Sequence, residues 1–298
     1  MALGHSLLGI SLTHTGDLEA ARAELEAAQG VRGTQREKAS YLGFDGHDLA
    51  GVFLARTMWL QGHPDQALEC ARRTVEQARL VDHPVTLSIA LVWAVSVLLW
   101  VGDLERAEEH IDQFIARAET HSLGPYHAVG RGYKGQLAVR RGDVASGVES
   151  LQRALVDLHA VRYELLTTAF SISLVEGFAA LRRFDEAMAC VEEAISMVES
   201  NGDASYMPEL LRVKGNLMVT MGLRADGEAS LLQSLELSRR QGAAAWELRT
   251  GTNLAALWSG SGDGARARGV LKPLLDRFEE GRDTSDVREA EKVLGSLA

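Results

Sequence analysis

The sequence has little of the residues that cross-link a fold or interrupt a helix. It contains two cysteines and five prolines in 298 residues, and aromatic residues make up 6% of the chain. Two cysteines, Cys70 and Cys190, cannot form the disulfide framework of a small secreted domain. The first ten residues, MALGHSLLGI, lack the basic region and cleavage site of a signal peptide. We therefore expect a reducing, cytoplasmic location.

Positive charge is also in deficit, since the net charge is −10. An acidic surface repels phosphate backbones, so we expect no direct nucleic-acid partner. The longest apolar run, Leu87–Val101, has 15 residues, whereas a helix that spans a membrane needs about 20. We interpret this run as a buried helix and expect no membrane association.

Catalytic and metal-binding motifs are not found. The nine histidines include no pair at i,i+4 spacing and no His-Glu-x-x-His motif. The chain has no Gly-x-Ser-x-Gly motif, and no Gly-Lys-Ser/Thr follows the glycines at 260, 262 and 264. We therefore expect no metal, no cofactor and no enzyme activity. The alternative, a helical-repeat hydrolase with a site in its groove, has no specific nucleophile to support it.

The sequence repeats with a period near 40 residues. Seven related segments each contain a small residue a few positions after a turn, with spacings of 46, 40, 40, 40, 42 and 38. These small residues are Ala21, Ala67, Ala107, Gly147, Ala187, Ala229 and Ala267. A period held over seven units indicates a solenoid, in which each unit packs against its neighbours.

Each unit is typical of a helix, a turn and a second helix. We place the turns near residues 16, 62, 102, 142, 183, 224 and 262, where the first helix ends at a Gly or an Arg. Glycine suits the left-handed conformation that follows the end of a helix. Six aspartates lie near the start of the next helix, where a carboxylate can cap free N–H groups. They are Asp17, Asp65, Asp103, Asp143, Asp185 and Asp263.

The tripeptide His63-Pro64-Asp65 also occurs in J-domain co-chaperones, but the preceding LARTMWLQG is apolar rather than basic. Four of the six other units have Gly-Asp at the same point. Proline suits the first turn of a helix because it loses no hydrogen bond there. We therefore interpret the tripeptide as a turn.

The prediction for residues 1–298 is a single all-α domain. It is a right-handed superhelical αα solenoid of about seven helix pairs, with a capping helix near 284–297.

This pattern resembles the tetratricopeptide repeat (TPR) family, which pairs small residues in its two helices. Small or β-branched residues lie twelve positions before six of the small residues: Gly9, Ala55, Val95, Gly135, Val175 and Ala255. Two of them are valine, and the TPR period is 34 rather than 40. The longer period implies longer helices or loops.

Four stretches are similar to the C-terminal TPR region of large bacterial signalling and transcriptional regulators. They are FDGHDLAGVFLARTMWLQGHPDQAL, YMPELLRVKGNLMV, LLQSLELSRRQGAAAWELRTGTNLAALW and LLDRFEEGRDTSDVREAEKVL. Those regulators carry an adenylate-cyclase-like or winged-helix domain and a STAND-type ATPase before this region. The present sequence contains no Walker A motif, cyclase domain or helix-turn-helix. The resemblance implies a sensor or interaction role.

The first helix of each pair lines the concave face of a solenoid. The repeat register places a set of polar and aromatic side chains on this face, and we predict that they bind a ligand. The set is Arg56, Trp59, Trp100, Gln136, Glu176, Glu209, Arg212, Asn216 and Arg249. The ligand would be a protein segment, a peptide or a small molecule. A peptide-pheromone receptor is a further hypothesis, although such receptors need a basic or Asn-rich groove and this one is mixed.

Overall fold

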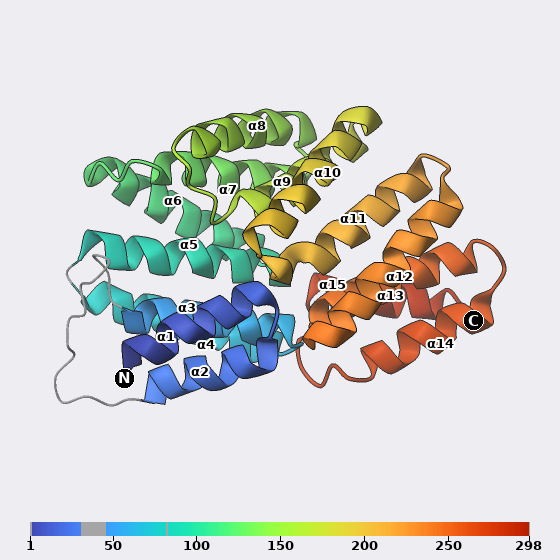
Figure 1. Cartoon of the computed structure of the whole chain (residues 1–298), viewed down its shortest axis with the longest axis horizontal. Coiled ribbons are helices and arrows are strands. Elements are labelled where there is room, and N and C mark those ends of the chain that lie inside the picture. The colour runs from blue at the N-terminus through green and yellow to red at the C-terminus, as the bar shows by residue number, and fades with distance from the viewer. Residues whose placement is uncertain (1, 31–45, 82, 298) are drawn as a thin grey trace. The chain divides into compact units, whose positions relative to one another are not determined.

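The computed structural model describes residues 2–30, 46–81 and 83–297. In these residues it contains fifteen α-helices, one short 3-10 helix and no strand, which confirms the predicted all-α solenoid class (Figure 1). Phe44 and Asp45, which open one of the four similar stretches, lie outside the described residues. The chain divides into two compact units, residues 1–130 (unit 1) and residues 131–298 (unit 2). The single-domain expectation stays a prediction.

Unit 1 contains three consecutive helix pairs and the start of α7. The helices are α1 (Ala2–Thr15), α2 (Leu18–Gly30), α3 (Gly46–Leu60), α4 (Pro64–Leu80), α5 (Pro84–Val101), α6 (Leu104–Thr120) and α7 (Tyr126–Arg141). Among the described residues, α5 alone has the length and hydropathy of a membrane-spanning helix, and 83% of it is buried inside the protein. The apolar run therefore forms part of the core of unit 1, as an all-round apolar helix should.

Unit 2 continues the pairing and ends on an unpaired helix. Its elements after α7 are α8 (Val144–Ala160), α9 (Thr167–Ala180), α10 (Phe184–Asn201), the 3-10 helix Ala204–Tyr206, α11 (Met207–Thr220), α12 (Arg224–Gln241), α13 (Ala244–Ser259), α14 (Gly264–Leu275) and α15 (Ser285–Gly295). Val287 and Ala290 of α15 join the core that α13 and α14 form with Leu254, Trp258 and Leu271. Helix α15 thus occupies the predicted capping position.

The backbone repeats every 40 residues. Positive φ angles occur in the turns within pairs at Gly62, Gly102, Gly142, Arg182, Gly222 and Gly262, and in the turns between pairs at Ser122, Arg162, Gly202 and Gly242. Each position follows the previous one of its set by 40 residues. The turns predicted near 183 and 224 therefore have their left-handed residues at 182 and 222. Three of the ten positions are not glycine, although side chains are strained there.

The small residue of the second helix permits close packing in each pair. Ala187 and Ala267 are fully buried. The choice of Ala229 is wrong, because that residue is exposed and Gly227 is buried in its place. A Cβ atom at Gly227 would lie 2.7 Å from the carbonyl oxygen of Gly215, so even alanine would push α11 and α12 apart. With Gly227, the spacings after Ala67 are all 40 residues.

The His63-Pro64-Asp65 tripeptide forms a helix start. Pro64 lies in the first turn of α4, and His63 occupies the N-cap position without a side-chain bond to the helix. Asp103 and Asp263 are true caps, since their carboxylates accept hydrogen bonds from the backbone N–H groups of Arg106 and Arg266 at 3.1 and 3.2 Å. The tripeptide is thus architectural in this structure.

The non-glycine turns predict opposite effects of two matched substitutions in unit 2. Arg162→Gly should raise the free energy of unfolding by roughly 0.5–1 kcal/mol, because glycine tolerates the φ of 56° without strain. Gly202→Ala should lower it by about 1 kcal/mol. A Cβ at Gly202 meets no atom within 4 Å, so the backbone alone accounts for the effect. Urea denaturation followed by helical circular dichroism measures both free energies of unfolding. If both substitutions change stability in the same direction, backbone strain does not explain their effects.

Candidate functional site

In unit 1, the three predicted site residues are buried and contact one another. Arg56, Trp59 and Trp100 are 2%, 3% and 7% exposed. The two indole rings stack with centroids 4.5 Å apart, and the Arg56 guanidinium lies 4.7 Å from the Trp100 ring and 4.6 Å from that of Trp93. Arg56 Nη1 also donates to Ser96 Oγ at 2.8 Å. These contacts make the cluster part of the packing between α3 and α5 rather than an open wall.

In unit 2, Gln136 connects two first helices. Its Nε2 atom on α7 donates to the carbonyl of Ala169 at 3.1 Å and to Ser173 Oγ at 2.8 Å, both at α9. Because the side chain is buried and occupied by these bonds, it positions α7 against α9. The contact is the first of a series that links the first helices of successive pairs.

A buried carboxylate organises the remaining residues of unit 2. Glu209 is 3% exposed and lies in the first turn of α11. It accepts two hydrogen bonds from Arg212, from Nε at 2.7 Å and from Nη2 at 2.8 Å, and one from Arg249 Nη1 at 3.0 Å. A buried carboxylate is stable only when such partners compensate it. The two arginines are therefore required by Glu209, whatever else they bind.

Both arginines extend the network to neighbouring helices. Arg212 Nη2 donates to Glu176 of α9 at 3.2 Å, and its Nη1 donates to Asn253 Oδ1 of α13 at 3.0 Å. The same oxygen of Asn253 accepts a bond from Asn216 at 2.8 Å. Arg249 Nε donates to Asp286 of α15 at 2.8 Å. One network thus joins α9, α11, α13 and α15.

The charges of this network shift the pKa values of its members. Burial by itself would raise the pKa of Glu209, but the charges and hydrogen bonds of Arg212 and Arg249 outweigh it and lower the pKa to about 2. The carboxylates in turn raise the pKa of both arginines against the opposing effect of burial. All three groups are consequently charged at neutral pH.

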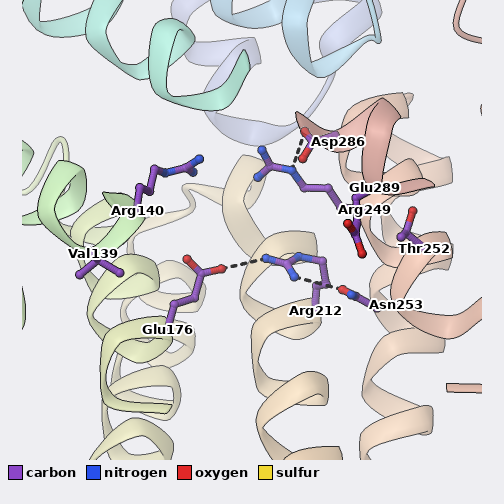
Figure 2. Close-up of a pocket in the computed structure, with 9 residues that line it drawn as sticks. All are labelled: Val139, Arg140, Glu176, Arg212, Arg249, Thr252, Asn253, Asp286 and Glu289. Carbon is purple, nitrogen blue, oxygen red and sulfur yellow. Dashed lines mark hydrogen bonds and ion pairs between the residues drawn. The ribbon is translucent and has the colours of Figure 1, made fainter. Parts of the chain in front are cut away.

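A cavity of about 350 Å³ opens beside this network in unit 2 (Figure 2). It lies among the first helices of the pairs and α15. Its walls are formed by Val139, Arg140, Glu176, Arg212, Arg249, Thr252, Asn253, Asp286 and Glu289. Arg140 is an exposed residue, but its guanidinium points into the cavity. There, loss of hydration and the charge of Arg249 lower its pKa, and the charges of Glu176, Asp286 and Glu209 partly offset them.

The structure brings together only some of the predicted residues. Glu176, Arg212 and Arg249 line the cavity, and Glu209 and Asn216 support them through hydrogen bonds. The sequence reasoning missed the lining residues Val139, Arg140, Thr252, Asn253, Asp286 and Glu289. The repeat carried a signal for three of them: Arg140, Thr252 and Glu289 follow the predicted residues Trp100, Arg212 and Arg249 by 40 residues each.

The cavity offers hydrogen-bond donors and acceptors of both charges. None of its nine lining residues is a serine, cysteine or histidine, and the Thr252 hydroxyl donates to the Leu248 carbonyl at 2.8 Å. Over the described part of the chain, no three His, Cys, Asp or Glu side chains are grouped to hold a metal ion. The arrangement therefore suits the binding of a polar ligand.

Comparison with known proteins agrees with the repeat. The tetratricopeptide repeat family matches residues 2–27 and 49–73, which correspond to α1–α2 and α3–α4. These two segments are therefore similar to tetratricopeptide repeats. An uncharacterized protein of Rhizobium meliloti (strain 1021) is 25% identical over 228 residues. The match covers 74% of the present chain and 22% of that much longer relative.

Two solved structures share the fold of the present chain. A Rap protein complexed with competence and sporulation factor has a TM-score of 0.63 and 10% identity, over 99% of this chain and 80% of that one. NprR in complex with its cognate peptide NprX has a TM-score of 0.58 and 12% identity, over 99% and 82%. At such identities the likeness concerns the fold.

The aromatic environment of Arg56 predicts that lysine cannot replace it. Arg56→Lys should lower the free energy of unfolding by about 1–2 kcal/mol, because an ammonium cannot stack on two rings as a planar guanidinium does. The control is Arg73→Lys, an exposed position in the same unit that should change stability by less than about 0.5 kcal/mol. Urea denaturation measures both, and equal stability of the two variants would show that the stacking contributes nothing.

The low pKa of Glu209 predicts how stability depends on pH. Its ordinary value is 4.5 and its folded value is about 2, so its stabilising effect is complete above 4.5 and is lost as the pH falls through 2. Glu209→Gln should cost roughly 3 kcal/mol at pH 7, and the difference from wild type should shrink between pH 4.5 and 2.

The control for this experiment is Glu199→Gln, which removes an exposed carboxylate of α10. Its urea denaturation curves should follow wild type at every pH. A Glu209→Gln variant whose deficit stays constant from pH 7 to pH 2 would exclude the assigned pKa.

Proposed function

We propose that the chain is a non-catalytic TPR interaction module that binds a peptide in the cavity of unit 2. The observation that carries this proposal is the position of the cavity. Its walls come from the first helices α7, α9, α11 and α13 and from α15, so one ligand would contact five elements at once. Solenoids use the surface formed by successive repeats for binding in this way.

The size and chemistry of the cavity suit a short polar segment. A volume of about 350 Å³ lies at the lower end of the range for ligand sites. Three arginines and the Asn253 amide face it, and Asn216 lies directly behind Asn253. Glu176, Asp286 and Glu289 balance the three arginines, so the wall is mixed in charge, whereas the peptide-receptor hypothesis calls for a basic or Asn-rich groove.

The structural likenesses support a peptide over other ligand classes. NprR and the Rap protein are each known in complex with a partner, which is a cognate peptide in NprR and competence and sporulation factor in the Rap protein. Their fold covers 99% of the present chain. A peptide offers the regularly spaced N–H and C=O groups that amide and guanidinium side chains on successive helices can contact.

We place this module in bacterial signal transduction or transcriptional regulation. The four stretches similar to the TPR region of STAND-type regulators support this context. The length of the Rhizobium meliloti relative, of which the match covers 22%, agrees with such a multidomain setting. Ligand binding in the TPR module would then be sensed by other domains of the regulator.

The structure also determines which substitutions can test the cavity. Arg212→Ala or Arg249→Ala would remove a partner of the buried Glu209 carboxylate, which costs about 3–5 kcal/mol of stability. A loss of binding in either variant would then be ambiguous. Glu289 is a better position because it is exposed on α15 and lies at the wall of the cavity.

Glu289→Trp should block the cavity without disturbing the buried network. We expect affinity selection from a degenerate hexapeptide pool, read by mass spectrometry, to enrich peptides on the wild-type chain. Enrichment should fall at least tenfold on Glu289→Trp, on the order of the loss of one well-packed contact site. The control Glu291→Trp has the same charge change at an exposed position of α15 that does not line the cavity, and it should retain enrichment.

Two results would contradict the proposal. If the wild-type chain enriches no peptide, the module does not bind peptides of this length. If Glu289→Trp and Glu291→Trp both retain the enriched peptides, the binding site lies elsewhere on the chain.

A further inference from the structure

The exposed side of α1 is apolar and uncharged. The exposed residues of this helix are Gly4, Leu7, Leu8, Ser11 and Thr15, and the two leucines are 45% and 48% exposed. Helix α1, ALGHSLLGISLTHT, contains no Asp, Glu, Lys or Arg on any side, although 24% of the chain is charged. A helix without a charged face is typical of a position between two neighbours, as α5 shows in the same unit.

The repeat shows what the position of Leu7 does in the next first helices. Leu7 corresponds to Phe53 of α3, 46 residues later, and to Trp93 of α5, after another 40. Phe53 is buried and faces α1, since its ring centroid lies 5.4 Å from that of His14. Trp93 in turn packs on Phe53 with ring centroids 4.8 Å apart. At this position each first helix therefore packs against the preceding one.

The position of Ser11 belongs to the same row. Ser11 corresponds to Thr57 of α3, which is fully buried and whose Oγ1 lies 3.1 Å from Oγ1 of Thr13 on α1. In α3 this row thus covers the preceding first helix, whereas on α1 it faces solvent. Helix α1 consequently presents a surface built for packing against a helix, and none of the described helices covers it.

The row on α1 is symmetric about its midpoint. Positions 4 and 11 lie along the middle of one helix face, and positions 7 and 8 lie on either side of it. In an antiparallel pair of such helices related by a two-fold axis, Gly4 of one helix meets Ser11 of the other. Each leucine then meets the same leucine of the other helix. Small residues at the midline let the backbones approach, and the leucines cover the contact from both sides.

The charge of the chain also favours a second copy as the partner. A chain with a net charge of −10 repels its own copy unless the contact surface is uncharged. Within residues 2–15 no exposed side chain is charged, and His5 is paired with Glu24 of α2 at 2.6 Å inside unit 1. A foreign partner is usually selected by complementary charges, which this face does not offer.

We propose that the exposed row of α1, formed by Gly4, Leu7, Leu8 and Ser11, is the interface of a two-fold homodimer. Two helices of 14 residues, each about 20 Å long, bury less than the roughly 1,200–2,000 Å² of a standard interface. The dimer is therefore weak, with a dissociation constant on the order of 10–100 µM. The proposal does not depend on the peptide site in unit 2, because all four residues belong to unit 1.

Sedimentation velocity tests the association. The wild-type chain should change from monomer to dimer between about 1 and 300 µM. Leu7→Glu should weaken association at least about tenfold, because two carboxylates would face each other near the axis. An equal mixture of Leu7→Glu and Leu7→Lys should recover the dimer, which also shows that both variants are folded. The control Leu80→Glu makes the same change at the more exposed leucine of α4 and should dimerise like wild type.

Cysteine trapping tests the antiparallel geometry. Gly4→Cys mixed with Ser11→Cys should form a disulfide-linked heterodimer when oxidised with diamide. Neither variant should do so by itself, because positions 4 and 4 of an antiparallel pair lie about 10 Å apart along the helix axis. A Cβ at Gly4 meets no atom within 4 Å, so the fold accepts the substitution. The native cysteines should not compete, since Cys70 is buried and burial raises the pKa of Cys190 to about 12.

Three results would overturn the proposal. A wild-type chain that stays monomeric at about 300 µM has no such interface, and the row on α1 then awaits a different occupant, such as a helix of another protein. Association that Leu7→Glu leaves unchanged takes place on another surface. A disulfide-linked dimer of Gly4→Cys alone would exclude the antiparallel pairing. None of these results affects peptide enrichment, so the two proposals can fail separately.

Discussion

The close approach of two helices at a small residue is the constraint on which this structure depends. At Ala67, Ala107, Gly147, Ala187, Gly227 and Ala267 the second helix of a pair packs against the first. At Gly227 the backbone of α11 comes so near that a Cβ would meet the Gly215 carbonyl at 2.7 Å. Because the contact recurs every 40 residues, successive first helices present the same rows of side chains.

Within unit 2, these rows contain buried charged side chains. Glu209 would be unstable in the interior by itself, and Arg212 and Arg249 compensate it at distances of 2.7 to 3.0 Å. The same two side chains form part of the cavity wall. A ligand that takes hydrogen bonds from these arginines would compete with the carboxylates that hold neighbouring helices together, so binding there would be coupled to stability.

The repeat and the helix pairs could be predicted from the sequence because they rest on local signals. Turn glycines, aspartates near the start of the second helix and small residues recur along the chain, and these local signals predict the helix pairs. The error at Ala229 arose because alanine and glycine two positions apart both satisfy a search for small residues. Only the crossing of α11 and α12 shows that Gly227 is the contact. The positive φ angles at Arg162 and Arg182 could not be predicted either, because the sequence has no glycine at these two turn positions.

The sequence by itself determined the all-α repeat and the row on which each polar residue lies, since both depend on spacing along the chain. Tertiary structure alone decided that Arg56, Trp59 and Trp100 are packed against one another, that Glu209 is buried, and that Arg140 faces Arg249. Burial and ion pairing depend on distances between helices that are far apart in sequence. A row of charged residues therefore does not reveal which of them compensate one another and which face the cavity.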